Sequence, residues 1–288
     1  MQLGDERESD SVEDRRGGGI GRAGGLGAGV TLIALVASYF LGINPGALLG
    51  VAENVPRASS SAGQTHPIDP RTDPEAVMVA EVKKVLALTE DTWEALFKQA
   101  GGQYRRPHLV LFRGSTPTAC GTGQAAMGPF YCPGDQKVYL DLGFFNEMAR
   151  RFHAGGDFAR AYVIAHEIGH HVQDLTGVSK KTDAMRSRMS KKEYNRVSVR
   201  VELQADCYAG VWAHHANRAR PFLDPGDIEE ALKAANAIGD DTLQRQSRGV
   251  VVPDAFTHGS SAQRMHWFKT GFDTGKIKSC DTFAASSP

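Results

Sequence analysis

The chain has 288 residues, 41% of them hydrophobic and 23% charged, so it is long enough to bury a full enzymatic core. Lysine and arginine together number 33, and so do aspartate and glutamate, which leaves no overall basic field to draw the protein to nucleic acid. No segment resembles a nucleic-acid-binding module. The sequence therefore predicts a globular protein without a nucleic-acid partner.

The N-terminal region predicts a membrane anchor. Residues 1–22 are polar, charged and Gly-rich, which favours a disordered tail. Residues 23–52 carry no charged side chain, and residues 24–43 just reach the roughly 20 residues that span a bilayer. Because arginines precede this run, the positive-inside rule predicts a cytoplasmic N-terminus and a single crossing that places the rest outside. A cleaved signal peptide is the alternative, but the segment before the run is long and acidic and no A-x-A site follows.

Residues 56–74 are rich in Pro, Ser, Ala, Gly and Thr, and residues 53–72 are predicted to form an extracytoplasmic linker. The folded domain is expected to comprise residues 73–288. Within it, apolar periodicity predicts a helix over 74–99, and short apolar runs predict strands at 108–112 and 137–142. Residues 178–189 lack periodicity and are expected to form an exposed connection, and residues 224–239 a further helix. The expected fold class is α+β, mostly helical, with a small sheet packed on the helix described next.

A helix expected from its cap at Asp157 to Thr176, and ended by Gly177, contains the pentapeptide His166-Glu167-Ile168-Gly169-His170. Histidines four residues apart lie one turn apart on the same helix face, so both rings can reach one zinc ion. Glu167 then lies beside the open coordination position, where it can take a proton from water and return it to a leaving amine.

The next helix supplies the third expected ligand. It begins near Ser190, which forms an S-x-x-E capping box with Glu193. Glu202 and Asp206 lie one turn apart on this helix. We expect His166, His170 and Glu202 to bind one zinc ion per chain, with Asp206 accepting the second ring proton of a ligand histidine. The alternative is two amphipathic helices with solvated polar faces, and it requires both motifs to arise by coincidence.

The four cysteines fit an oxidising compartment. Cys120 and Cys132 bracket a Gly-rich loop, and their spacing differs from the C-x-x-C of a zinc knuckle, so a disulfide is expected. A disulfide between Cys207 and Cys280 would attach the C-terminal tail to the second metal-site helix. Free buried thiols are the alternative for each pair.

The two motifs, followed along the chain, resemble the putative neutral zinc metallopeptidase family of bacteria. The resemblance covers nearly the whole chain; it rests on residues 166–173 and 202–213, with further matches at 11–16, 138–141 and 256–259. It implies a zincin-like fold, in which substrate adds as a strand to a sheet edge, and Val138–Leu142 is the expected edge.

Thr257-His258-Gly259, with Arg264 downstream, is similar to the T-H-P…R segment of the membrane-bound CAAX prenyl and heat-shock zinc peptidases, although Gly259 replaces their proline. This similarity implies that His258 is catalytic and stabilises the oxyanion that forms during peptide hydrolysis. The alternative role for His258 is a structural cap on the following helix.

Together these features predict a membrane-tethered, extracytoplasmic zinc endopeptidase, with residues 73–288 as its metallopeptidase domain and a protein or peptide as its substrate. Two alternatives are a zinc-containing binding or scaffold protein of the cell envelope and an amidase acting on cell-wall peptide. The pattern specifies neither the cleavage preference nor the oligomeric state.

Overall fold

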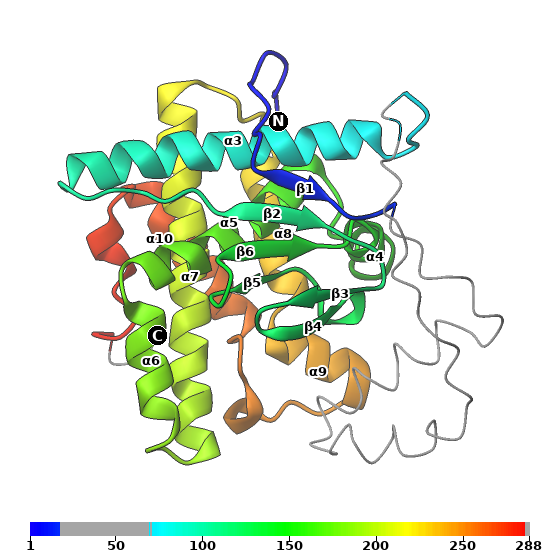
Figure 1. Ribbon diagram of the computed structural model, residues 1–288. Coiled ribbons are helices and arrows are strands. Elements are labelled where there is room, and N and C mark those ends of the chain that lie inside the picture. Colours follow the sequence, from blue (N-terminus) through cyan, green and yellow to red (C-terminus); the bar gives the residue numbers. More distant parts are fainter. Residues whose placement is uncertain (18–68, 70, 286–288) are drawn as a thin grey trace, which may run out of the picture.

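A computed structural model describes residues 1–17, 69 and 71–285 (Figure 1). The expected membrane anchor at 23–52, and nearly all of the expected linker at 53–72, lie outside these residues. Within the described part of the chain, no helix is both long enough and apolar enough to cross a membrane.

The fold is α+β and mostly helical, as the sequence predicts. Its helices are α3 (Ala76–Gln99), α4 (Gly143–Phe152), α5 (Asp157–Leu175), α6 (Val178–Arg186), α7 (Lys191–Ala219), α8 (Asp227–Ala237), α9 (Asp240–Arg248) and α10 (Ser261–Thr274). Short 3-10 turns occupy Ala125–Met127, Pro253–Ala255 and Ile277–Cys280. The strands are β1 (Val12–Asp14), β2 (His108–Leu111), β3 (Ser115–Thr118), β4 (Gly121–Gln124), β5 (Phe130–Cys132) and β6 (Lys137–Leu140).

Four strands form one sheet in the order β1-β2-β6-β5 (Figure 1). Strands β1, β2 and β6 run parallel and β5 pairs antiparallel with β6; β3 and β4 form a separate hairpin. Alternate residues of β2 and β6 point to opposite faces, as strand geometry requires. One face of the two strands joins the main core with α3, α5 and α7, through Leu109, Leu111, Val138 and Leu140. Residues of the other face pack under Phe130 in a smaller cluster.

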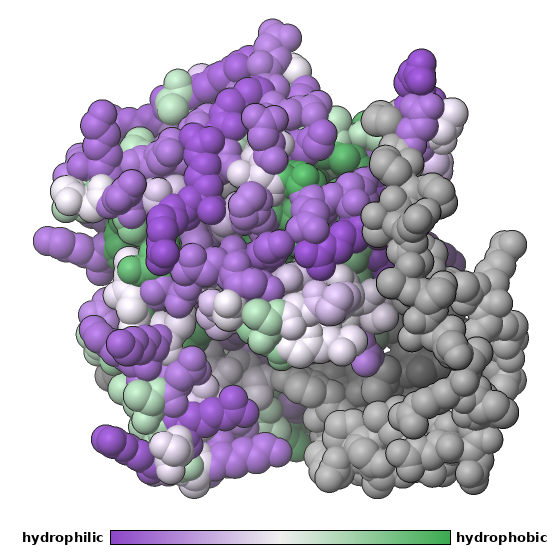
Figure 2. Space-filling model, in the orientation of Figure 1, coloured by the Kyte–Doolittle hydropathy of each residue, from purple (hydrophilic) through white to green (hydrophobic). Residues whose placement is uncertain are grey.

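Helices α5, α7 and α10 pack closely because small residues lie where they cross. A Cβ added at Gly169 of α5 would meet the Ala205 carbonyl oxygen of α7 at 2.9 Å. Gly210 of α7 and Gly271 of α10 likewise face each other's helix backbone without room for a methyl group. The Gly169 contact sets the distance between the two metal-site helices. Figure 2 shows a mainly hydrophilic surface on one face of the molecule, in agreement with this internal core.

The N-terminal residues are part of the domain, which corrects the expectation of a disordered tail for residues 1–17. Strand β1 pairs with β2 in the register Val12↔Leu109 to Asp14↔Leu111. Arg16 is buried and forms ion pairs with Asp14, Asp73 and Glu75 at 2.6, 2.7 and 2.9 Å. The charged composition of this segment favours a disordered tail, but in the fold the Arg16 charge is paired with carboxylates of the domain.

This pairing also bears on membrane topology. A chain that crossed a bilayer once between residues 18 and 68 would put β1 and β2 on opposite sides. Strands that exchange backbone hydrogen bonds must lie in one compartment. Such a bond joins Arg15 N to the Leu111 carbonyl oxygen at 2.8 Å. The described fold and the expected single crossing therefore exclude each other.

Three further expectations are corrected. Strand β6 lies between β2 and β5, so the expected sheet edge at Val138–Leu142 is internal, and β5 is an edge instead. The expected connection at 178–189 contains helix α6, which is polar and gains its stability by packing on α5 and α7. Asp157 is the first residue of α5, and Gly156 occupies the cap position. The capping box of Ser190 and Glu193 at the start of α7 is confirmed.

Candidate active site

Helices α5 and α7 bring the three expected metal ligands together. His166 Nε2 lies 3.2 Å from Glu202 Oε2, and His170 Nε2 lies 3.6 Å from the same oxygen. Ligand atoms about 2.0–2.2 Å from a tetrahedral zinc ion lie about 3.3–3.6 Å apart. The nitrogen and oxygen donors therefore fit zinc both in kind and in spacing. Three carboxylates elsewhere, of Asp157, Asp227 and Glu230, also lie close together. The N-terminal ammonium group is paired with two of them, Asp157 and Asp227, and so occupies the place of a cation.

The Nδ1 atoms of both histidines are held by acceptors, which leaves each Nε2 facing Glu202. His166 Nδ1 donates to Asp206 Oδ1 at 2.8 Å, as the sequence predicts for Asp206. His170 Nδ1 donates to Gln173 Oε1 at 2.9 Å. A ligand histidine whose other nitrogen is hydrogen-bonded has a fixed tautomer and ring orientation. Both rings are thus set for metal binding through Nε2.

Asp206 is the centre of a buried polar network. Its carboxylate accepts from the Tyr162 hydroxyl at 2.5 Å and from Arg264 Nε at 2.8 Å, besides His166. Burial favours the neutral acid, but the charges of Arg264 and His166 outweigh it and lower the pKa of Asp206 to about 2. Burial likewise lowers the pKa of His166, yet Asp206 outweighs it and raises that pKa to about 10. An ionised Asp206 is therefore a strong acceptor for His166.

Tyr162 and Arg264 are the other two partners of Asp206. The Tyr162 hydroxyl group donates to Asp206 Oδ1, so it supports a ligand histidine indirectly. Arg264 was noted only for its spacing from His258, and it is buried against Asp206. Tyr162 lies four residues before His166, so both are on the same face of α5. This spacing is a sequence signal that places Tyr162 near the site.

Glu167 lies within the same turn of α5 and is largely buried. Across the residues that the structure describes, no side chain or backbone group donates a hydrogen bond to its carboxylate. A carboxylate at this place, without a structural partner, is available to exchange protons with water. This arrangement suits the role of general base expected from the motif.

His258 lies in a loop that Asp240, the first residue of α9, holds in place. Asp240 Oδ2 accepts from the backbone nitrogens of Thr257, His258 and Gly259 at 2.7, 2.6 and 3.1 Å. Burial lowers the pKa of His258, but the Asp240 hydrogen bond and the charge of Glu202 outweigh it and raise that pKa. The loop thus keeps His258 within electrostatic reach of the Glu202 ligand.

Gly259 explains a departure from the T-H-P pattern. Its φ is +92°, a value that proline cannot adopt, so this loop is built differently from a T-H-P loop. The helix cap that was the alternative role for His258 belongs to Ser260, whose hydroxyl accepts from Gln263 N in a capping box.

Both expected disulfides are present. Cys120 and Cys132 join the hairpin loop to β5, with an S–S distance of 2.04 Å. Cys207 and Cys280 join α7 to the C-terminal segment, with an S–S distance of 2.08 Å. No cysteine of the chain is free. The second disulfide lies one residue from Asp206, so the tail is part of the site's surroundings.

A helical α+β domain with H-E-x-x-H on one helix and a glutamate ligand candidate on the next defines a zincin-like class. The family described as "Putative neutral zinc metallopeptidase" matches residues 1–283, and the chain belongs to this family. No solved structure matches the chain.

Curated relatives extend this similarity. "Uncharacterized protein YpfJ" of Escherichia coli strain K12 is 47% identical over 295 residues, covering 99% of this chain and all of the relative. "Uncharacterized protein Rv2575" of Mycobacterium tuberculosis is 44% identical over 208 residues, covering 69% of each chain. The family implies zinc and a hydrolase.

Proposed function

We propose that the protein is a zinc endopeptidase that hydrolyses peptide bonds in protein substrates. One observation carries the proposal: two Nε2 atoms and one carboxylate oxygen meet at zinc-like spacing, and Glu167, in the same turn of α5, has no hydrogen-bond partner among the described residues. A structural zinc site has no need of such a carboxylate, because all its coordination positions are filled by protein. The three ligand residues, by contrast, leave one position open to water and substrate.

A bound zinc ion would polarise the scissile carbonyl group and lower the pKa of water to about 7. Glu167 takes the proton of the attacking water and then delivers it to the leaving amine. His258 is the cationic donor for the developing oxyanion, because Asp240 and Glu202 favour its protonated form. Asp206 and Gln173 keep the two ligand rings in the orientation that this chemistry needs.

Strand β5 is the candidate binding edge for an extended peptide. It is an edge of the four-stranded sheet and pairs antiparallel with β6. Tyr131 of β5 donates to Asp174 of α5 at 3.0 Å, which fixes this edge to the metal-site helix. Backbone groups on an open edge can pair with a substrate strand regardless of its sequence.

We place the protein outside the cytoplasm, attached to a membrane through its charge-free segment at residues 23–52. The two disulfides support this location, since such bonds persist in oxidising compartments. Residues 1–17 and the metallopeptidase domain belong to one fold, so the proposal puts both on the same side of the membrane.

The experiment that tests this function compares wild type with Glu167→Gln on an unstructured protein substrate, with a chelator control. Glutamine keeps the shape of the side chain and removes the carboxylate. We expect cleavage to fall by at least about 10²–10⁴-fold, the usual contribution of general acid–base catalysis, while zinc content stays the same.

Equal cleavage by wild type and Glu167→Gln would contradict the mechanism. A wild-type protein that binds zinc but cleaves only cell-wall peptide would favour the amidase alternative. Zinc binding without hydrolysis of either substrate would favour the scaffold alternative. Comparing the peptide termini of envelope fractions carrying each form would then identify the substrates directly.

A further inference from the structure

Gln173 is a buried side chain that connects two of the expected metal ligands. Its Oε1 accepts from His170 Nδ1 at 2.9 Å. Its Nε2 donates to the Val201 carbonyl group at 2.7 Å, next to the Glu202 ligand, and to Gln204 Oε1 at 3.1 Å. Gln173 is 0% exposed. A single amide therefore fixes a ligand ring on α5 and the backbone beside a ligand on α7.

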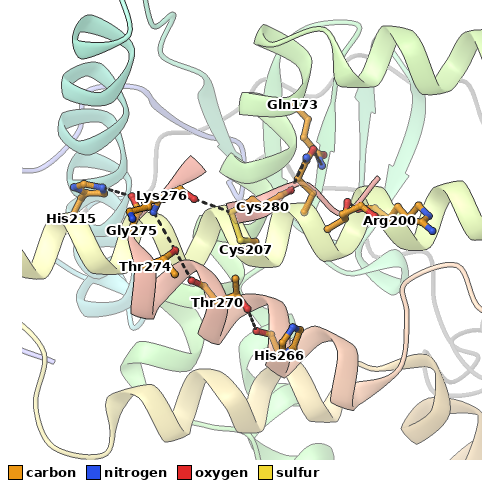
Figure 3. Close-up of a disulfide and its surroundings, with 12 residues drawn as sticks. Gln173, Arg200, Cys207, His215, His266, Thr270, Thr274, Gly275, Lys276 and Cys280 are labelled. Atoms are coloured by element: carbon orange, nitrogen blue, oxygen red, sulfur yellow. Dashed lines mark hydrogen bonds between the residues drawn. A yellow bond between two sulfur atoms is a disulfide. The ribbon is translucent and has the colours of Figure 1, made fainter. Parts of the chain in front are cut away.

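Gln204 extends this connection to the C-terminal segment. Its Nε2 donates to the Cys280 carbonyl oxygen at 3.0 Å. Cys280 is bonded to Cys207, which lies on α7 just after Gln204. Figure 3 shows Gln173, Arg200 and the disulfide gathered where this segment meets α7. A chain of hydrogen bonds thus leads from His170 through two glutamines to a carbonyl group beside a disulfide.

Residues 281–285 are held to α7 by hydrogen bonds between side chains and backbone carbonyl groups. The Thr282 hydroxyl donates to the Arg200 carbonyl group at 2.7 Å, and the Arg200 guanidinium donates to the Ala285 carbonyl group at 2.9 Å. Cys280 and Thr282 are both 0% exposed. These contacts and the disulfide fix the Cys280 carbonyl oxygen on one side of Gln204.

We propose that Gln173 and Gln204 are positioning residues for the zinc ligand His170, and that the Cys207–Cys280 disulfide holds the far end of their hydrogen-bond chain. The proposal rests on the proposed zinc site. Each amide here has a definite donor and acceptor partner, so loss of one member leaves the next buried group unpaired. Loss of a partner that orients a metal ligand typically lowers metal affinity by about 10–100-fold.

The test measures zinc affinity of the full chain by chelator competition, together with the absorption of the cobalt-substituted protein. Gln173→Met and Gln204→Met remove the amides at similar volume, and the Cys207→Ser/Cys280→Ser double variant removes the disulfide without leaving a thiol. We expect zinc affinity to fall about 10–100-fold for Gln173→Met, and in the same direction for the other two. The absorption spectrum of the cobalt-substituted protein should change in the same variants.

Matched controls separate positioning from general destabilisation. Gln244 is also a buried, hydrogen-bonded glutamine, but its Oε1 accepts from Val252 N and has no link to His170. Cys120→Ser/Cys132→Ser removes the other disulfide. Gln244→Met and this double variant should keep wild-type zinc affinity. Gln173→Glu keeps the acceptor for His170 but removes the amide group that donates to Val201 and Gln204, so it should regain only part of the affinity that Gln173→Met loses.

The outcomes are distinct. Weaker zinc binding in Gln204→Met and in Cys207→Ser/Cys280→Ser, with both controls unchanged, supports the proposal. Wild-type affinity in Gln204→Met and in Cys207→Ser/Cys280→Ser overturns it and leaves the proposed peptidase intact. Equal losses in Gln244→Met and Gln204→Met also overturn it, because they indicate a general effect on the fold. A wild-type chain that binds no zinc overturns the proposed function as well.

Discussion

His258 is an ionisable side chain on a loop that Asp240 holds in place. Its contribution to catalysis can be measured separately from metal binding. Its ring lies near Glu202, while its backbone nitrogen is held by Asp240. We expect His258→Ala to lower turnover by about 10²–10³-fold, the typical loss on removal of one oxyanion donor, with zinc retained. Steady-state kinetics and metal analysis on the same sample measure both quantities. Unchanged turnover would assign His258 a structural role only.

Glu202 contributes the oxygen donor to the expected ligand set. Burial favours its neutral form, but the two histidines outweigh this and hold its pKa well below the ordinary value, so it is a carboxylate at neutral pH. Glu202→Ala leaves only the two histidine nitrogens as donors, and we expect strongly reduced zinc occupancy after dialysis. Metal analysis by atomic emission tests this. Zinc retained at wild-type stoichiometry would rule out Glu202 as the third ligand.

At the residue scale, the motifs were sufficient to predict which side chains come together, because helical spacing is a local property. His166 and His170 share a face through their four-residue separation, and Asp206 follows Glu202 by one turn. The partner of His170 was not predicted, since Gln173 acquires its role only through contacts to Val201 and Gln204 on another helix. Asp240 was missed for the same reason: its importance comes from a loop 17 to 19 residues away.

At the element scale, the N-terminal strand is attached through ion pairs that acid should weaken. Hydrogen bonds from Arg15 and Lys137 outweigh burial and lower the pKa of Glu13 from 4.5 to about 2, and Arg16 lowers the pKa of Asp73. Because both folded-state pKa values are depressed, their stabilisation is fully present above the unfolded-state values. It is lost as the pH falls from about 4.5 towards 2.

We therefore expect β1 to detach before the core unfolds as the solution is acidified. The Arg15 amide, bonded to the Leu111 carbonyl group, reports this detachment by hydrogen exchange corrected for the intrinsic effect of pH. Glu13→Gln should reduce the pH dependence, because one titrating carboxylate is gone. Exchange that stays constant across the acid range would show that the ion pairs do not hold the strand.

Long helices with apolar periodicity were predicted well, whereas short or polar elements were not. Helix α3 begins and ends close to the expected residues, and α7 begins at the expected capping box, because their buried faces repeat every three to four positions. Helix α6 has almost no buried face, and β1 is three residues long. Such elements form through packing on other elements, so a local pattern does not reveal them. The order of strands in the sheet, which makes β5 an edge, is also set at this level.

At the scale of the whole molecule, two lines of evidence meet at the N-terminus. The arginines before the charge-free segment favour a cytoplasmic N-terminus, while the disulfides favour an oxidising location for the domain. A single crossing would satisfy both but would separate β1 from β2. The paired strands, and the buried ion pairs of Arg16 with Asp73 and Glu75, require one compartment for both. Local charge rules and tertiary contacts thus give opposing predictions for the same 17 residues.

We expect cysteines introduced in residues 1–17 and in the rest of the domain to react with a membrane-impermeant maleimide. The reagent is added to spheroplasts of cells that express the protein. Asp10→Cys and Lys191→Cys each introduce one exposed thiol, on the N-terminal segment and at the start of α7. The unmodified chain is the control, because its four cysteines are all in disulfides. Equal labelling at both positions is the expected result.

Other labelling patterns have specific meanings. Labelling of Lys191→Cys alone would contradict the shared compartment and restore the single crossing, which requires that β1 leave the sheet in cells. Labelling of neither position, with full labelling after lysis, would retain the shared fold but contradict the location outside the cytoplasm. The two disulfides would then have to form in a reducing compartment, where glutathione and thioredoxin keep thiols reduced. The same experiment therefore decides both the side of the membrane and whether the first strand belongs to the folded domain in cells.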